Sequence, residues 1–166
     1  LPEGPKLALG ILHTGVVSMD WSRAFRDLQL PPGTAYVFTS HWPFDVSMNR
    51  VCEAALQQRA EWLLFLDSDL IPPPESATRL MSHNLPIVQG LYHAKVGGHF
   101  PFVMRRTPQQ GPDGKPMSVF GASEFTPGAM VPVDTVATGL LLIHRRVLQA
   151  FKDAGEPWFT WTMGRK

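Results

Sequence analysis

The apolar residues of this chain gather in short continuous runs, and the segments between the first runs carry apolar residues at helical spacing. A short apolar run predicts a strand that is buried on both faces of a sheet. Apolar residues that recur every three or four positions predict a helix with one buried face. On this basis we expect strands at 6–12, 35–39, 61–66, 86–92, 100–105 and 140–143, and helices at 19–30, 46–59, 72–84 and 145–154.

The order of these elements predicts the fold class. Strand and helix alternate through the first half of the chain, which is typical of parallel strands joined by right-handed crossovers. The second half is richer in strands, and the Pro-, Gly- and Gln-rich segment 107–118 indicates a surface excursion such as a hairpin tip. We therefore expect a single α/β domain over residues 1–166, a three-layer αβα sandwich around a mixed, mainly parallel sheet.

Composition narrows the class of protein. Of the 166 residues, 44% are apolar and 17% are charged, which indicates a folded globule rather than a disordered chain. The net charge of +1 does not indicate a nucleic-acid partner. No apolar run reaches the roughly 18 residues of a membrane span, and a single cysteine, Cys52, excludes an internal disulfide. We expect a cytoplasmic protein whose residues 1–166 are truncated or incompletely ordered at the carboxyl end.

The strongest candidate chemistry follows the strand at 61–66, where Asp67, Ser68 and Asp69 stand directly after an apolar run. In open α/β sheets, ligands bind at the carboxyl ends of the strands. Two carboxylates spaced two residues apart at such an end can approach one cation, and Mg²⁺ shares carboxylate oxygens with substrate phosphates. The sequence thus favours a metal–diphosphate site. The alternative interpretation is a solvated Asp-Ser-Asp turn after a core strand.

Polar residues also follow the two earlier strands. Thr14 follows the first strand, and the loop from Ser40 to Asp45 follows the second. Parallel strands bring these ends to the edge of the sheet that carries the two aspartates. The next helix presents free N–H groups that suit an anion, and Asn49 and Arg50 near its start add donors. A phosphate-binding edge is therefore predicted, although no Gly-rich phosphate-binding loop is present.

At this point the chain resembles glycosyltransferases of the GT-A fold, which is Rossmann-like. The resemblance covers roughly residues 6–153 in collinear order. It is carried by the strand and D-x-D motif at 60–69, the helices at 49–55 and 73–80 that flank it, a G-x-Y segment at 90–92, and a segment at 138–146 similar to the family's G-x-x-L-I-R-R.

The resemblance implies a transferase, of the hexosyltransferase class, that binds a nucleotide-diphosphate sugar with Mn²⁺ or Mg²⁺. Asp69 would then be the direct metal ligand, and Asp67 would meet the metal or the ribose, with Ser68 between them. Thr14, Ser40 and Asp45 match the region where the family holds base and ribose. A cation at the diphosphate would stabilise the negative charge of the departing nucleotide. The acceptor, whether glycan, small molecule or protein, is not indicated.

The sequence departs from the family in two places. The acidic catalytic segment that the family carries after the region 138–146, often followed by a metal-binding His, is not found before Lys166. The Asn49-Arg50 order also differs from the Arg-Asn pair of relatives. Asp134 is the remaining candidate for a general base, but an aspartate in a turn before a strand is the commoner explanation of that residue.

Other residues leave two interpretations open. A third metal ligand can come from His93, His99 or His144, although a lone histidine is more often structural. The Gly-containing segment 95–99 fits either a mobile lid or a plain hairpin loop. Trp158 and Trp161 fit either acceptor stacking or core packing. An aspartate before a helix, such as Asp45, is more often an N-cap, and Arg50 fits a surface ion pair about as well as a phosphate contact.

Three other functions remain possible on the sequence. A donor-binding module without activity would explain the missing acidic segment. A nucleotidyltransferase of similar architecture would carry a Gly-rich basic loop after its first strand, which 12–15 lacks. The Asp-Ser-Asp-Leu string is also similar to that of haloacid-dehalogenase phosphatases, but those place it after the first strand and have Thr or Val where Ile71 stands.

Overall fold

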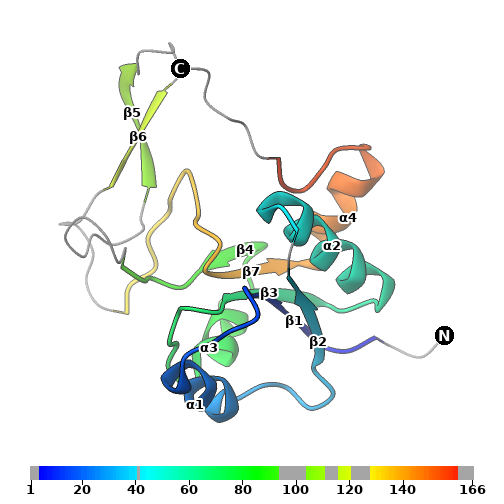
Figure 1. The fold of residues 1–166 in the computed structure, drawn as a ribbon. Coiled ribbons are helices and arrows are strands. Elements are labelled where there is room, and N and C mark those ends of the chain that lie inside the picture. Colours follow the sequence, from blue (N-terminus) through cyan, green and yellow to red (C-terminus); the bar gives the residue numbers. More distant parts are fainter. Residues whose placement is uncertain (1–3, 41, 94–103, 111–115, 121–127, 161–166) are drawn as a thin grey trace.

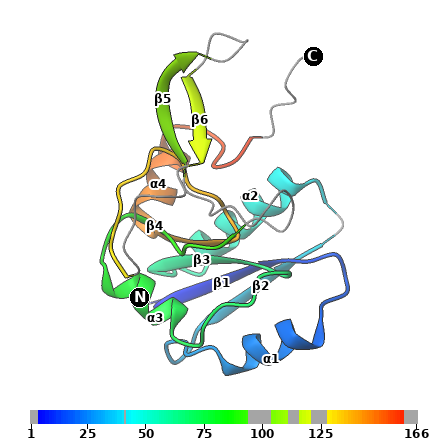
Figure 2. The same ribbon diagram turned by 90° about the vertical axis from the view of Figure 1, so that its left-hand side faces the viewer.

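The computed structural model describes residues 4–40, 42–93, 104–110, 116–120 and 128–160, the side chains of 104–110 and 116–120 excepted. A five-stranded sheet lies between helices on both of its faces, so the predicted three-layer αβα architecture is confirmed (Figures 1 and 2). The elements are β1 (Leu7–Leu12), α1 (Met19–Asp27), β2 (Ala35–Thr39), α2 (Phe44–Gln57), β3 (Trp62–Asp67), α3 (Ser76–Ser82), β4 (Ile87–Gln89), β5 (Met104–Gln110), β6 (Pro116–Phe120), β7 (Leu140–His144) and α4 (Arg145–Asp153).

The sheet is mixed and mainly parallel, with the strand order β2-β1-β3-β7-β4. β1 pairs in parallel with both β2 and β3, while β7 pairs antiparallel with both β3 and β4. β4 therefore points in the same direction as the first three strands. The chain moves to one side of β1 to form β2 and to the other side to form β3. This reversal of strand order is the position at which open α/β sheets form a ligand crevice.

Alternating side chains of the central strands supply two hydrophobic layers, because successive residues of a strand point to opposite faces of the sheet. Leu64 and Leu66 of β3 pack in the layer that includes Trp21 of α1 and Leu80 of α3. Leu63 and Phe65 pack in the layer that includes residues of α2 and α4. The continuous apolar run of β3 is thus explained by burial on both faces.

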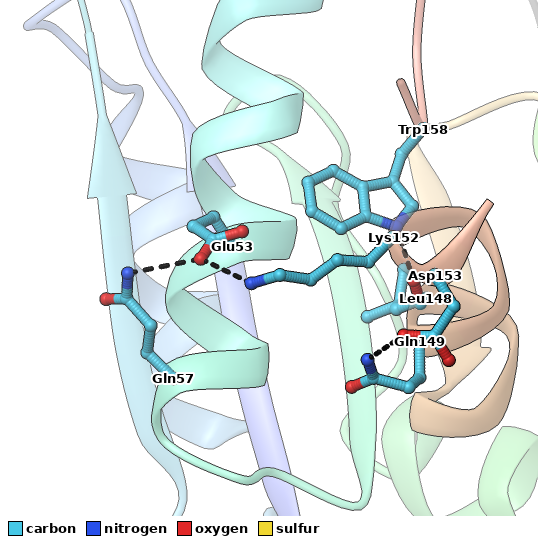
Figure 3. Close-up of polar contacts among 7 residues, drawn as sticks. All are labelled: Glu53, Gln57, Leu148, Gln149, Lys152, Asp153 and Trp158. Carbon is cyan, nitrogen blue, oxygen red and sulfur yellow. Dashed lines mark hydrogen bonds and ion pairs between the residues drawn. The ribbon is translucent and has the colours of Figure 1, made fainter. Parts of the chain in front are cut away.

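Helices α2 and α4 lie side by side on the second face, and polar contacts join them (Figure 3). Lys152 Nζ of α4 lies 2.8 Å from Glu53 Oε1 of α2. Trp158 follows α4, and its indole Nε1 donates to the Leu148 carbonyl at 2.8 Å. Trp158 also packs against this hydrophobic layer. These contacts give Trp158 the core role rather than the acceptor-stacking role.

Several predicted boundaries move. α1 ends at Asp27 rather than residue 30, α2 begins at Phe44 rather than residue 46, and β4 keeps only three residues. β5 and β6 form an antiparallel hairpin whose strands extend into the segment 107–118, expected to be a surface excursion. Strand pairing outweighs the low strand propensity of Pro and Gln here. None of the helices within the described residues has the length and apolar character needed to cross a bilayer.

Candidate functional site

A pocket of about 460 Å³ opens at the carboxyl ends of β1, β2 and β3, at the point where the strand order reverses. Five of the residues predicted to contact a ligand line it together: Thr14, Ser40, Asp67, Ser68 and Asp69. The remaining lining residues are Leu12, His13, Thr39, Trp42, Phe44 and Ser47. The structure therefore brings the D-x-D segment and the ends of the two earlier strands into one site.

The Asp67 backbone is held on both sides. Its N–H donates to the Gly139 carbonyl at 3.0 Å, at the start of β7. Its carbonyl accepts the Trp21 indole Nε1–H at 2.9 Å, from α1, and the Leu70 N–H at 3.2 Å. Trp21 is buried, so this hydrogen bond forms where water does not compete strongly. The strand end and the turn after it are thus fixed, and Asp67 and the exposed Asp69 follow each other along the pocket wall.

Gly139 lies in close contact with Asp67 and with Tyr92, which follows β4. The Tyr92 hydroxyl oxygen accepts the Gly139 N–H at 2.9 Å. A Cβ atom on Gly139 would stand 2.8 Å from that oxygen and 3.0 Å from Asp67 Oδ2, so only glycine fits without displacing them. Burial raises the pKa of the Tyr92 phenol above its ordinary value, and the nearby Asp67 and Asp69 carboxylates raise it further.

Tyr92 and Gly139 belong to the G-x-Y and Gly-containing segments that carry the resemblance, but no role was predicted for either residue. Trp21 donates to Asp67 across 46 positions of the chain, Tyr92 accepts from Gly139 across 47, and no local spacing predicts such contacts. His13 is another lining residue not predicted. Its side-chain Nδ1 accepts the Gly15 N–H at 3.1 Å. Its backbone N–H donates to the Thr39 carbonyl, and this hydrogen bond joins the ends of β1 and β2.

The wall formed by the start of α2 is aromatic. Trp42 and Phe44 line the pocket, and both are about half exposed. The Arg50 guanidinium carbon lies 3.6 Å from the Trp42 ring centroid, which is a cation–π contact. Arg50 was predicted to bind phosphate, with a surface ion pair as the alternative. In the structure its guanidinium stacks on the Trp42 ring, and Arg50 itself is not a lining residue.

Asn49 does not contribute to the pocket. Because α2 begins at Phe44, Asn49 lies in the second turn, beyond the free N–H groups of the helix start. Its Nδ2 donates to the Phe159 carbonyl at 2.7 Å and to the Asp45 carbonyl at 2.8 Å, and its Oδ1 accepts the Phe159 N–H at 3.1 Å. The amide therefore binds the segment after α4, and Asn49 is not among the residues that line the pocket. Asp45 lies in the first turn of α2 and is not a lining residue either.

Asp134, the candidate base, lines a different pocket. This pocket, of about 570 Å³, lies beside β4 and the segment 129–136, and its walls are mostly apolar. Leu91 lines it, while the neighbouring Tyr92 contacts Gly139 beside Asp67. The larger volume does not make it the better candidate site, because the smaller pocket holds the convergent polar groups at the strand ends.

Of the histidines proposed as third metal ligands, the two that the structure describes, His93 and His144, do not line the pocket. His144 packs on Trp62 at the amino end of β3, at the far end of that strand from Asp67. His93 is exposed and is not among the residues that line the pocket. His99, Trp161 and the segment 95–99 lie outside the described residues. Within the described part of the chain, no three His, Cys, Asp or Glu side chains are grouped to hold a metal.

The residues present still fit a hard divalent cation. Asp67 and Asp69 provide carboxylate oxygens at the carboxyl end of β3, and Ser40 and Thr14 line the same pocket. Mg²⁺ is commonly bound through one or two carboxylates, its other ligands being water and substrate phosphates. A site with two protein carboxylates is therefore sufficient for a cation that arrives with a diphosphate.

Comparison with known proteins bears on the fold alone. No protein-family model matches the chain, and no curated protein matches it. Among solved structures, the crystal structure of A197 from STIV superposes with a TM-score of 0.58 over 87% of this chain and 67% of that chain, at 18% sequence identity. This similarity supports the α/β architecture.

Proposed function

We propose that the protein is a metal-dependent glycosyltransferase of the GT-A type, which moves a sugar from a nucleotide-diphosphate donor to an acceptor. The observation that carries the proposal is the convergence of Asp67, Ser68 and Asp69 with Thr14 and Ser40 in one pocket at the strand-order reversal. The resemblance of the D-x-D strand and its collinear neighbours supports the same activity.

Each group of the pocket has a role in this proposal. Asp69 and Asp67 hold Mn²⁺ or Mg²⁺, and the bound cation supplies Lewis-acid stabilisation of the departing diphosphate. Thr14 and Ser40 offer hydroxyl groups to the ribose. The half-exposed Trp42 ring offers an apolar face to the base, and the Arg50 guanidinium on that ring adds positive charge beside it. Backbone contacts of Asp67 keep the carboxyl end of β3 in place.

The experiment is isothermal titration of the protein with UDP, GDP, ADP, CDP and TDP, each with and without Mn²⁺. We expect at least one diphosphate to bind, with an affinity that Mn²⁺ raises in the parent protein and not in Asp69→Asn. The matched control is Glu61→Gln, an acid at the other end of β3. If no diphosphate binds the parent protein with Mn²⁺, the proposal is wrong.

The second candidate function is that of a nucleotide-sugar-binding module, and the position of Asp134 is the observation that favours it. Asp134 lines the apolar pocket rather than the D-x-D pocket, so no described acid outside the D-x-D motif lines the donor site as a base. This favours a nucleotide-sugar-binding module without transfer activity. Slow release of free sugar from the matching nucleotide sugar, with water as acceptor, separates the two. Mn²⁺-dependent release that Asp69→Asn abolishes supports the transferase, and binding without release supports the module.

A further inference from the structure

Tyr92 has a contact pattern that strand packing alone does not explain. It follows the short strand β4, it is half-buried, and its hydroxyl oxygen accepts the Gly139 N–H at 2.9 Å. A phenol is both an acceptor and a donor, so the hydroxyl that accepts from Gly139 also has a proton with which it can donate. The position of a Cβ atom on Gly139 lies 2.8 Å from the Tyr92 oxygen and 3.0 Å from Asp67 Oδ2, so both oxygens border the same small space.

We propose that Tyr92 is a positioning residue of the D-x-D site, whose hydroxyl donates to the Asp67 carboxylate and fixes the direction in which that carboxylate faces the pocket. The proposal rests on the proposed function, because the orientation of Asp67 matters only when a cation or a donor binds there.

The surroundings of Asp67 give this hydrogen bond its role. The Asp67 N–H and carbonyl are already held by Gly139 and Trp21, so the backbone of this residue is fixed. A donor beside Oδ2 extends this support from the backbone of Asp67 to its carboxylate. Groups that form hydrogen bonds with a metal-ligating side chain orient that side chain and adjust its basicity. Removing such a hydrogen-bonding group commonly lowers metal affinity by about 10-fold or more.

The competing explanation is purely structural: Tyr92 merely provides a partner for the Gly139 N–H. The two explanations differ in what they predict for binding. A positioning role acts through the cation, so it affects the Mn²⁺-dependent part of nucleotide affinity. A structural role loosens the start of β7, so it affects binding with and without Mn²⁺ alike, or affects stability alone.

The test uses Tyr92→Phe, which keeps the ring and removes the hydroxyl. The matched control is Tyr36→Phe, the same change at the chain's other tyrosine, which is 49% exposed on β2. Each variant is titrated with the nucleoside diphosphate that shows the largest Mn²⁺ effect among UDP, GDP, ADP, CDP and TDP. We expect Tyr92→Phe to weaken Mn²⁺-dependent binding about 10-fold and to leave metal-free binding unchanged. Tyr36→Phe should match the parent.

The same measurements define failure. If the parent protein binds with Mn²⁺ and Tyr92→Phe binds equally well, or loses affinity equally without Mn²⁺, the positioning role is wrong and the proposed function stands. If the parent protein binds no diphosphate, the proposed function fails and this inference fails with it. Repeating Tyr92→Phe in an Asp67→Asn background covers the case of a destabilised variant. If Tyr92→Phe causes no further loss of affinity in that background, the result supports action through Asp67. If the loss of affinity is as large as in the parent protein, the result refutes it.

Discussion

Both ends of β3 are rich in polar residues, but the surroundings of these residues differ between the two ends. At the amino end, Trp62 packs edge-on against His144 with ring centroids 4.6 Å apart, and its indole N–H donates to Glu61. Lys6 lies 3.5 Å from the same glutamate. At the carboxyl end, Asp67 and Asp69 line an open pocket together with groups from β1 and β2.

Contacts and pocket lining distinguish structural from functional polar residues in this sheet. At the amino end the described polar groups contact one another or cap a helix, and they line neither of the two pockets described above. At the carboxyl end the Asp67 backbone is held by Gly139 and Trp21, and Asp67 and Asp69 line a cavity. Charged residues that line a cavity at the ends of strands mark a candidate ligand site.

The largest effect expected is on binding. Asp69→Asn should lower Mn²⁺-dependent nucleotide affinity at least about 100-fold, near 2.7 kcal/mol, because a charged ligand to the cation is lost. Its free energy of unfolding should stay within about 0.5 kcal/mol of the parent, since Asp69 is exposed. Glu61→Gln, at the other end of β3, should change neither quantity much. Equal losses in the two variants would contradict the comparison.

Gly139→Ala should act on both stability and binding. The added methyl group meets the Tyr92 ring and hydroxyl at 2.8 Å and Asp67 Oδ2 at 3.0 Å, so we expect a loss of about 2 kcal/mol in unfolding free energy. Chemical denaturation measures it, and titration should show weaker Mn²⁺-dependent binding. In Gly90→Ala the three atoms nearest to the methyl group all belong to the Leu140 side chain. That variant should lose stability and keep the Mn²⁺ effect on affinity, and the reverse pattern would refute the assignment.

The amino end of β3 predicts a pH effect on stability. His144 Nδ1 accepts the Arg146 N–H at 3.0 Å and caps α4, and burial, with Arg146 and Arg145 nearby, lowers the pKa of this imidazole. The unfolded chain therefore binds the proton more readily. The stability that the neutral cap contributes, about 1 kcal/mol, is present above the ordinary histidine pKa of about 6.5 and is lost as the pH falls through and below it.

His144→Asn keeps a capping oxygen that does not titrate. Between about pH 7.5 and pH 5.5, its unfolding free energy should fall less steeply than that of the parent protein, as measured by urea denaturation at each pH. His83→Asn replaces an exposed histidine after α3 and should keep the parent slope. A parent-like slope in His144→Asn would show that the cap is not the titrating group.

The smallest effect expected belongs to the ion pair at the amino end. Lys6 and Glu61 are about half exposed and their charged atoms lie 3.5 Å apart, so Lys6→Met should cost at most about 0.5 kcal/mol. Added salt should reduce the difference further, because exposed charges are screened. Nucleotide binding should not change. A loss of more than about 1 kcal/mol would mean that this end of the strand is more tightly coupled than its contacts indicate.

The prediction from sequence was accurate where one local pattern decides the structure. The apolar runs of β1, β3 and β7 could be placed within a residue or two, because burial on both faces requires continuous apolar side chains. The convergence of Thr14, Ser40 and the two aspartates followed from parallel strand order. Asn49, expected at the pocket, bonds to Phe159 instead; the start of α2 was placed two residues late, and Phe159 is 110 positions away along the chain.

Hydrophobic periodicity and strand direction were therefore enough to predict the α/β architecture and to place the Asp-Ser-Asp turn at a strand end. The contacts that hold that turn became visible only in the folded structure. Trp21 and Gly139 form hydrogen bonds with Asp67, and Tyr92 forms one with Gly139, because α1, β4 and β7 pack around the end of β3. Such contacts depend on the relative placement of whole elements, which no local pattern of residues encodes.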